Sequence, residues 1–555
     1  MTLKARSQFD VRFKELENMQ SPYQGSWKDI RDYQIPNRGN FVEDIGTKGL
    51  RKDLKIFNGT PGLSARTSQA GLTAGITSPS RPWFRLALAN TALNERADVR
   101  AYLRGVEEAL YQVFNRSNFY AQASLVYLET LGFGQGPMSI VADFETVAHF
   151  EAYTVGEYFI AVNNRGMVDV LYRRIHKTPV QLIEEFGEEN VSAATKEKVK
   201  GGNADTPVKI IHAVEPNDTR VPGMIDARNK AYRSVYYEVD ALSTDKAFLS
   251  VSGFDSFPYV VPRWSVNGNS PYGTDQPGII ALGDAKQLQS GAYEKARGLQ
   301  LNMRPPLQAP SNLKNSNIHY VPGGITYVDQ FGGSGNAGIK SMFDNRVPLG
   351  DIIQDNNDIE ERIRNAYYVN LFLSILANDR PQDMKAEVAF QIDKERLLML
   401  GPALDNFSNQ FLSPTIDRVF GLSEDAGILP EPPDDLDQEE LKVEYVSALA
   451  KAQKLAGISN MERMVSLAGT IDAIIPGTID KIDGDQVIDE AGEALDVPSK
   501  IIRSDEDTAK IRADNQQRDN MQVALESGVA AAAAAKDLAD APIGTGSALD
   551  VLVGT

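Results

Sequence analysis

Cysteine and histidine, the side chains that most often serve as nucleophiles, general bases or metal ligands, are scarce in this sequence. Its 555 residues include no cysteine, which excludes disulfides, thiolate metal sites and thiol nucleophiles. The four histidines form no His-Glu-x-x-His or His-x-His pair: His149, His176, His212 and His319. The sequence also lacks the Gly-x-x-x-x-Gly-Lys loop of motor ATPases and the Gly-x-Ser-x-Gly elbow of hydrolases. It therefore predicts no catalytic residues, no cofactor and no metal site.

Carboxylates leave one enzymatic alternative open. With 75 Asp and Glu residues, some pairs that could hold a divalent ion for nuclease or hydrolase chemistry are expected by chance. Asp480–Glu490 approaches a calcium-binding loop, because Gly484 in the sixth position puts Glu490 in the twelfth. Ile479 then stands first, where a carboxylate is needed, so a charged connector is the simpler interpretation.

Two short motifs could bind a ligand but have simpler structural interpretations. Gly132–Pro137 (GFGQGP) has the glycine spacing of a nucleotide loop, yet it follows a helical pattern and Pro137 replaces the third glycine. We interpret it as a turn from helix into sheet. Arg81–Leu86 (RPWFRL) places two aromatics beside two arginines. We expect these aromatics to anchor a turn in the core, with cation–π contact to a ligand or base as the alternative.

Length and charge limit the classes of protein that the chain can belong to. At 555 residues two or more domains are expected, and a net charge of −18 argues against tight nucleic-acid binding over the whole surface. DNA could still slide past an acidic wall. Residues 1–120 carry 18 Lys and Arg against 12 Asp and Glu, whereas residues 434–500 carry 6 against 15. No signal peptide or long apolar run is present, so we expect neither secretion nor a membrane span.

The elements that must position any site form an α+β body followed by long helices. Helical patterns cover residues 3–19, 26–33, 56–76, 98–133, 179–186 and 191–199. Strand patterns cover residues 139–143, 150–153, 158–163, 168–173, 208–214, 233–239 and 247–251, with a hairpin turn at Asn163–Gly166.

Two amphipathic stripes stand at the centre of the chain, at Gly278–Met303 and Pro348–Ala377. If continuous, each helix is about 40 Å long at 1.5 Å per residue. An antiparallel pair of this kind cannot cover both of its sides, so neighbouring subunits are its expected partners.

The remainder reads as further helices joined by an acidic linker. A helix is expected over Leu397–Phe411, where apolar residues form one continuous stripe. We expect Pro402 to kink this helix and Pro414 to kink or end it. Residues 430–440 form the linker, and helices are expected at the following ranges: 441–456, 461–474 and 490–495.

Several stretches, in order, resemble one family. They are Trp27–Pro36, Ser78–Leu86, Leu131–Met138, Gly156–Gly166, Gln181–Gly187 and Ser270–Gly273, the last leading into a long helix. In these stretches the chain is similar to the head-to-tail connector, or portal, proteins of short-tailed bacteriophages. The resemblance implies a portal-type fold with these parts: wing (1–277), first stem helix (278–304), small α/β clip (305–346), second stem helix (347–377), tunnel loop (378–387), long wing helix region (388–429), helical crown (430–503) and a helical or disordered C-terminal tail (504–555).

The same resemblance implies a function without enzymatic chemistry. Such proteins form a ring, commonly of twelve subunits, at one capsid vertex of the virion, through which double-stranded DNA enters and leaves. The implied partners are further copies, the major capsid protein and scaffold, the packaging motor (terminase) at the clip, and tail adaptors, with assembly in the host cytoplasm and no membrane. Arg380 and Lys385 in the tunnel loop are expected to approach DNA, with a solvated turn of ordinary charges as the alternative. A metal-dependent nuclease or hydrolase, or an internal scaffold or core protein, is the alternative function.

Overall fold

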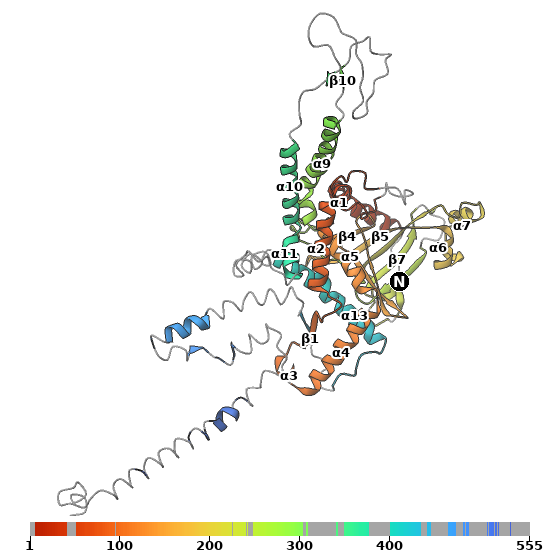
Figure 1. Cartoon of the computed structure of the whole chain (residues 1–555). Helices are drawn as coiled ribbons and strands as arrows, with labels where there is room; N and C mark the ends of the chain where they lie inside the picture. Colours follow the sequence, from red (N-terminus) through yellow and green to blue (C-terminus); the bar gives the residue numbers. More distant parts are fainter. Residues whose placement is uncertain are drawn as a thin grey trace, which may run out of the picture. The chain divides into compact units, whose positions relative to one another are not determined.

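The structure is a computed structural model that describes most of residues 6–433 (Figure 1). Within that span the description leaves out residues 42–51, 242–247, 304–306, 309–339, 342–348 and 377–399 and the single positions 95, 222, 225 and 240. Beyond it, residues 441–445, 464–472 and scattered positions between 475 and 533 are described. The chain divides into two compact units, Met1–Ala450 and Lys451–Thr555.

A mixed helix-and-sheet body occupies the first unit, as the α+β prediction requires. Its larger sheet has five antiparallel strands in chain order: β4 (Tyr158–Val162), β5 (Val168–Lys177), β6 (Val208–Pro216), β7 (Tyr232–Glu238) and β8 (Ser250–Phe254). A second sheet pairs β3 (Val147–Ala152), β2 (Met138–Asp143) and β9 (Tyr259–Val260). The predicted hairpin turn at Asn163–Gly166 is confirmed, with Gly166 at φ +75°. Helices α6 (Pro179–Phe186) and α7 (Ala193–Lys200) follow β5, also as predicted.

Helix α1 (Arg6–Tyr33) contributes side chains to two hydrophobic cores. Because side chains alternate across a strand, the neighbouring β4 residues Tyr158 and Phe159 enter different cores. Phe9 and Leu16 of α1 pack in the core that contains Phe159, and Trp27 packs in the core that contains Tyr158. The prediction of two helices at 3–19 and 26–33 is wrong, since one helix runs through Pro22. Burial of one stripe on both sides of the proline outweighs its missing amide donor.

Small side chains let three helices pack closely beside the sheets. α2 (Thr60–Ile76) lies against α5 (Phe119–Phe133), and α4 (Ala97–Arg116) precedes α5 after a break at Ser117-Asn118. The helical pattern over 98–133 is therefore two helices. A short α3 (Thr91–Asn94) follows β1 (Phe84–Leu88).

Strand β1 pairs antiparallel with β12 (Leu441–Tyr445). The helix predicted to begin at residue 441 is therefore wrong over these five residues. Leu441, Val443 and Tyr445 alternate with polar residues, a period of two that fits a strand as well as a helix end. Residues 464–472, in the second unit, are helical as predicted.

The two central stripes are helices, each divided once. The first comprises α8 (Pro277–Ile280) and α9 (Leu282–Met303), and the second comprises α10 (Leu349–Ala366) and α11 (Val369–Leu376). The length of about 40 Å assumed a continuous helix, but the second stripe breaks at Tyr367-Tyr368, where Tyr368 has φ +57°. Between α9 and α10 a two-residue pairing joins β10 (Leu307–Gln308) to β11 (Lys340–Ser341). Most of the predicted clip, residues 305–346, lies outside the described residues.

The last helical stretch of this unit runs over residues 400–407, a π-helical turn at Ser408–Leu412 and α13 (Ser413–Asp425). Pro414 neither ends the helix nor interrupts it. The turn before the proline widens instead, which is a common response to a lost i→i−4 hydrogen bond.

Candidate functional site at the base of the two rods

Helices α9 and α10, the rods, stand side by side and project from the body (Figure 1). Arg362, late in α10, donates to Asp284 at the start of α9 (3.0 Å), while Asn356 faces Gly291 about two turns further out. The order of these contacts makes the rods antiparallel, as predicted. Ile359 and Ile363 are fully buried near the body.

Four glycines set the distance between the body and the segment that leads into the first rod. A Cβ added to Gly278 would lie 2.2 Å from the Gly132 carbonyl oxygen, and one added to Gly273 would lie 2.0 Å from that of Gly134. Real Cβ atoms do not approach backbone that closely. Gly134 also takes φ +90° as it ends α5, which any other residue would resist. The turn interpretation of Gly132–Pro137 is thus confirmed, and two of its glycines allow close packing, Gly132 against Gly278 of α8 and Gly134 against Gly273.

A buried amide, Gln34, joins both rods to the body. Its Nε2 donates to the Gly278 carbonyl of α8 (2.8 Å), and its Oε1 accepts from the Tyr367 hydroxyl at the α10–α11 break. Ser68 of α2 donates to the Tyr367 carbonyl. Gln34, Tyr367 and Ser68 each expose at most 1% of their surface, so water cannot replace these partners.

A second amide, Gln289 on α9, fixes the chain that precedes α2. Its Oε1 accepts from the backbone amides of Phe57 (2.6 Å) and Asn58 (2.8 Å). The Asn58 side chain in turn donates to Glu360 on α10 (2.9 Å). Side-chain amides therefore connect the body to both rods. The sequence alone did not predict these contacts. Trp27–Pro36, which contains Gln34, and Ser270–Gly273 were recognised only by resemblance.

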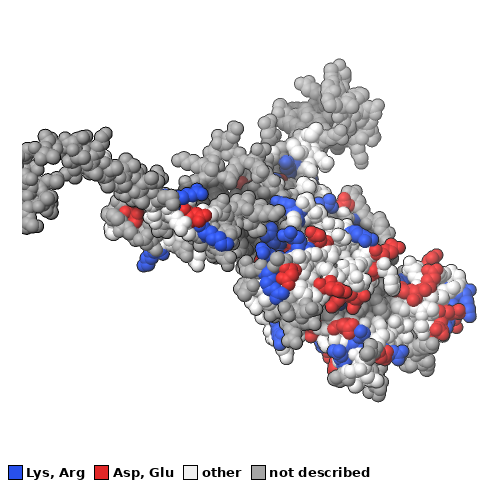
Figure 2. Space-filling view, turned by 90° about the horizontal axis from the view of Figure 1, so that it is seen from below, with Lys and Arg blue, Asp and Glu red and all other residues white. Residues whose placement is uncertain are grey.

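The outward face of α10 is acidic. Its exposed carboxylates lie three to four residues apart, which places them on one side of the helix: Asp351, Asp355, Asp358 and Glu361. Arg362, exposed beside them, is held by Asp284, and Arg364 forms an ion pair with Glu361 (3.6 Å). The other three acids, Asp351, Asp355 and Asp358, present negative charge to whatever the rods face. On the body surface shown in Figure 2, by contrast, acidic and basic side chains are interspersed.

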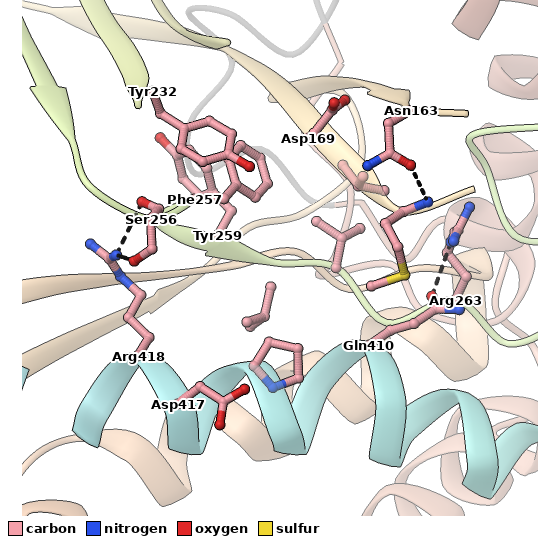
Figure 3. A pocket seen from close by; sticks show the side chains of 15 residues that line it. Asn163, Asp169, Tyr232, Ser256, Phe257, Tyr259, Arg263, Gln410, Asp417 and Arg418 are labelled. Atoms are coloured by element: carbon pink, nitrogen blue, oxygen red, sulfur yellow. Dashed lines mark hydrogen bonds between the residues drawn. The ribbon is translucent and has the colours of Figure 1, made fainter. Parts of the chain in front are cut away.

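A pocket of about 330 Å³ lies between α13 and the sheets (Figure 3). Arg418 donates to the backbone oxygens of Ile140 (2.7 Å) and Ser256 (3.2 Å), and burial lowers the pKa of this guanidinium to about 10. Arg263 donates to Gln410 (3.0 Å). Both arginines thus cross-link the helix to the sheets. The carboxylates of Asp169 and Asp417, whose pKa values are raised by burial, stand on opposite walls and do not converge on one point.

His212 is a core side chain. Its Nε2 shares a hydrogen bond with Ser234 (2.9 Å) and its Nδ1 with Tyr259 (3.1 Å), and burial lowers its pKa to about 3. Trp83 and Phe84 are also buried, so the prediction that they anchor the core is confirmed. A base or ligand could stack only on an exposed ring face, which these two buried side chains do not offer.

The predicted site residues, Arg380 and Lys385, lie outside the described part of the chain, as do His319 and the acidic positions of the 480–490 loop. Within residues that are described, no three His, Asp or Glu side chains come together in a way that could hold a metal ion. None of the described helices combines the length and apolar content that crossing a membrane requires.

Comparison with known proteins identifies relatives over nearly the whole chain. The family described as bacteriophage head to tail connecting protein matches residues 6–502. The portal protein of Salmonella phage epsilon15 is 35% identical, covering 97% of this chain and 96% of its own length. The probable portal protein of Bordetella phage BPP-1 is 36% identical, covering 94% of each chain. Among solved structures, the neck of an empty GTA particle is 13% identical with a TM-score of 0.32, covering 77% of this chain and 93% of its own, too distant to carry an argument.

Proposed function

The chain belongs to the family of bacteriophage head-to-tail connecting proteins, and on this premise we propose that it is a portal subunit. Copies of it form a ring at one capsid vertex, through which the genome is packaged and later ejected. The observation that carries this proposal is the identity of 35% and 36% to two phage portal proteins over almost the full length of each chain. A shared short motif could not account for such coverage.

The geometry of the rods supports a conduit. Two antiparallel helices that project from a body leave one side bare, and in a ring the neighbouring copies cover it. The acidic stripe of α10 repels phosphate, so a duplex passing that face does not adhere to it. On this account the rods are the stem, residues 305–346 are the clip where the motor and then the tail adaptors dock, and residues 430–503 belong to the crown.

Neither alternative function gains support from the described residues. The pocket beside α13 holds two carboxylates that do not converge, whereas a metal-dependent nuclease needs a convergent cluster. The named relatives are portal proteins, and neither is called a scaffold or core protein.

Electron microscopy and native mass spectrometry of the purified full-length chain test the proposal. We expect closed rings, viewed along an axis with a central hole, and a subunit number of twelve. Monomers and dimers alone at micromolar concentration would contradict it.

The tunnel-loop assignment has its own test. Replacing Arg380 and Lys385 together by alanine is expected to spare ring assembly but to impair genome packaging or retention in virions. Normal filling and retention in virions that carry the double variant would remove these two residues from the proposal and leave the ring untouched.

A further inference from the structure

We propose that, in the ring, Phe144 of one copy inserts into the pocket beside α13 of the next copy. This inference rests on the proposed function, because only an assembly of copies brings the two features together. A ring joins each copy to its two neighbours through two different surfaces. A projecting group on one surface and a recess on the other can therefore meet at every contact around the ring.

Phe144 is the projecting group. It lies in the turn between β2 and β3 with a relative exposure of 110%, and no other large apolar side chain of the described residues exceeds 80%. Single exposed apolar residues are common on protein surfaces. An aromatic ring that stands free of its own chain on all sides, however, offers its whole surface to a partner, and burial of that surface favours association.

The turn holds Phe144 in a fixed direction. The Asp143 carboxylate accepts from the amide and the hydroxyl of Thr146, both at 2.8 Å. Val147, which pairs with Asp143 across the hairpin, has φ +69°, a conformation that is rare for a β-branched residue and persists only where its surroundings hold it. A side chain presented by a rigid turn loses little conformational entropy when it binds, which suits an aromatic anchor.

The pocket beside α13 is the recess (Figure 3). Its volume of about 330 Å³ exceeds the roughly 150 Å³ of an apolar cavity that holds benzene, so a phenyl ring fits with room for part of its turn. Met167 lines the pocket and is 40% exposed, so its sulfur is available to an aromatic ring. The other apolar and aromatic lining residues include Val168, Tyr232, Phe257, Val260, Val261 and Pro414.

The charges beside the two features are complementary. Glu145 follows Phe144 directly and is exposed. Arg165, also exposed, lies between Asn163 and Met167, which both line the pocket. In the described part of the chain neither Glu145 nor Arg165 belongs to an ion pair. Insertion of Phe144 would bring opposite charges to the edge of the pocket, which favours one orientation of the contact.

Thiol cross-linking of the assembled full-length protein tests the contact, because the chain has no cysteine of its own. Copies that carry Phe144→Cys are assembled together with copies that carry Met167→Cys. A short reagent that bridges two thiols is expected to give covalent dimers in this mixture and none in either variant alone, since each link needs one thiol of each kind. The double variant, with both thiols in every copy, is expected to give longer chains of linked subunits.

Val180→Cys in place of Met167→Cys is the matched control. Val180 is 41% exposed on α6, which follows the opposite end of β5 from Met167. Its mixture with Phe144→Cys is expected to give no dimers. Rings that yield no dimers from the Phe144 and Met167 mixture, or as many from the control, would overturn the inference and leave the proposed function standing. An unmodified chain that forms no rings would instead contradict the proposed function itself.

Removal of the ring of Phe144 gives a second readout. Phe144→Ser is expected to raise the protein concentration at which rings half-dissociate by about tenfold or more, as loss of an aromatic anchor does. Val180→Ser removes an exposed apolar side chain elsewhere and is expected to leave that concentration unchanged. An equal effect of the two substitutions, or no effect of Phe144→Ser, would count against the contact.

Discussion

At the scale of single residues, the most constrained positions are glycines whose missing Cβ lets two backbones touch. Gly278→Ala would place a methyl group 2.2 Å from the Gly132 carbonyl oxygen, and both atoms belong to helices that cannot shift independently. We expect this substitution to destabilise the body by about 2–3 kcal/mol, as overpacking does. Gly283→Ala, on α9 with nothing within 4 Å, is expected to be neutral or stabilising by up to ~1 kcal/mol. Thermal unfolding of the two variants measures the difference, and equal midpoints would contradict the packing argument.

His212 provides a pH-dependent prediction at the same scale. Burial, with Arg173 and Lys177 nearby, lowers its pKa to about 3, so the folded chain keeps it neutral while the unfolded chain protonates it near pH 6.5. Stability contributed by the neutral ring is therefore complete above pH 6.5 and declines as pH falls toward 3, by up to about 1.4 kcal/mol per unit. Unfolding midpoints between pH 6.5 and 5, above the range of most carboxylates, measure this slope. His212→Gln should flatten it and exposed His149→Gln should not; identical slopes in both variants would contradict the prediction.

At the scale of elements, periodicity located the rods to within a few residues, because alternation of buried and exposed positions is a local property of the chain. It could not locate the break at Tyr367-Tyr368, since a tyrosine in the left-handed region has no sequence signal. Nor could it find β12, whose partner β1 lies far away in the sequence. The body-to-rod contacts of Gln34 were missed for the same reason. An isolated glutamine at a helix end looks like any surface residue until the partners that bury it are known.

The docking of α11 onto α2 gives an element-scale prediction. Phe372 is 1% exposed and lies against Gly71, whereas Leu373 beside it is 50% exposed. Phe372→Ala should lower stability by about 3–5 kcal/mol or release α11, because a buried aromatic leaves a cavity. Leu373→Ala should cost less than about 1 kcal/mol. Limited proteolysis and thermal unfolding compare the two; greater damage from Leu373→Ala would mean that the exposed face of α11 is covered in the assembly.

At the scale of the whole molecule, the proposed function makes a prediction about where charge is placed. The exposed acids of α10 would line the proposed channel, while the acids at Glu188 and Glu189 lie on the body between α6 and α7. Asp355→Asn with Asp358→Asn should raise the affinity of the ring for short duplex DNA at low salt, with the gain lost as salt rises, since each removed carboxylate removes repulsion of phosphate. Glu188→Gln with Glu189→Gln changes the net charge equally and should have little effect. Fluorescence anisotropy over a salt series distinguishes position from net charge. Equal gains in both double variants would show that only total charge matters, and the acidic stripe would then have no special relation to the path of the DNA.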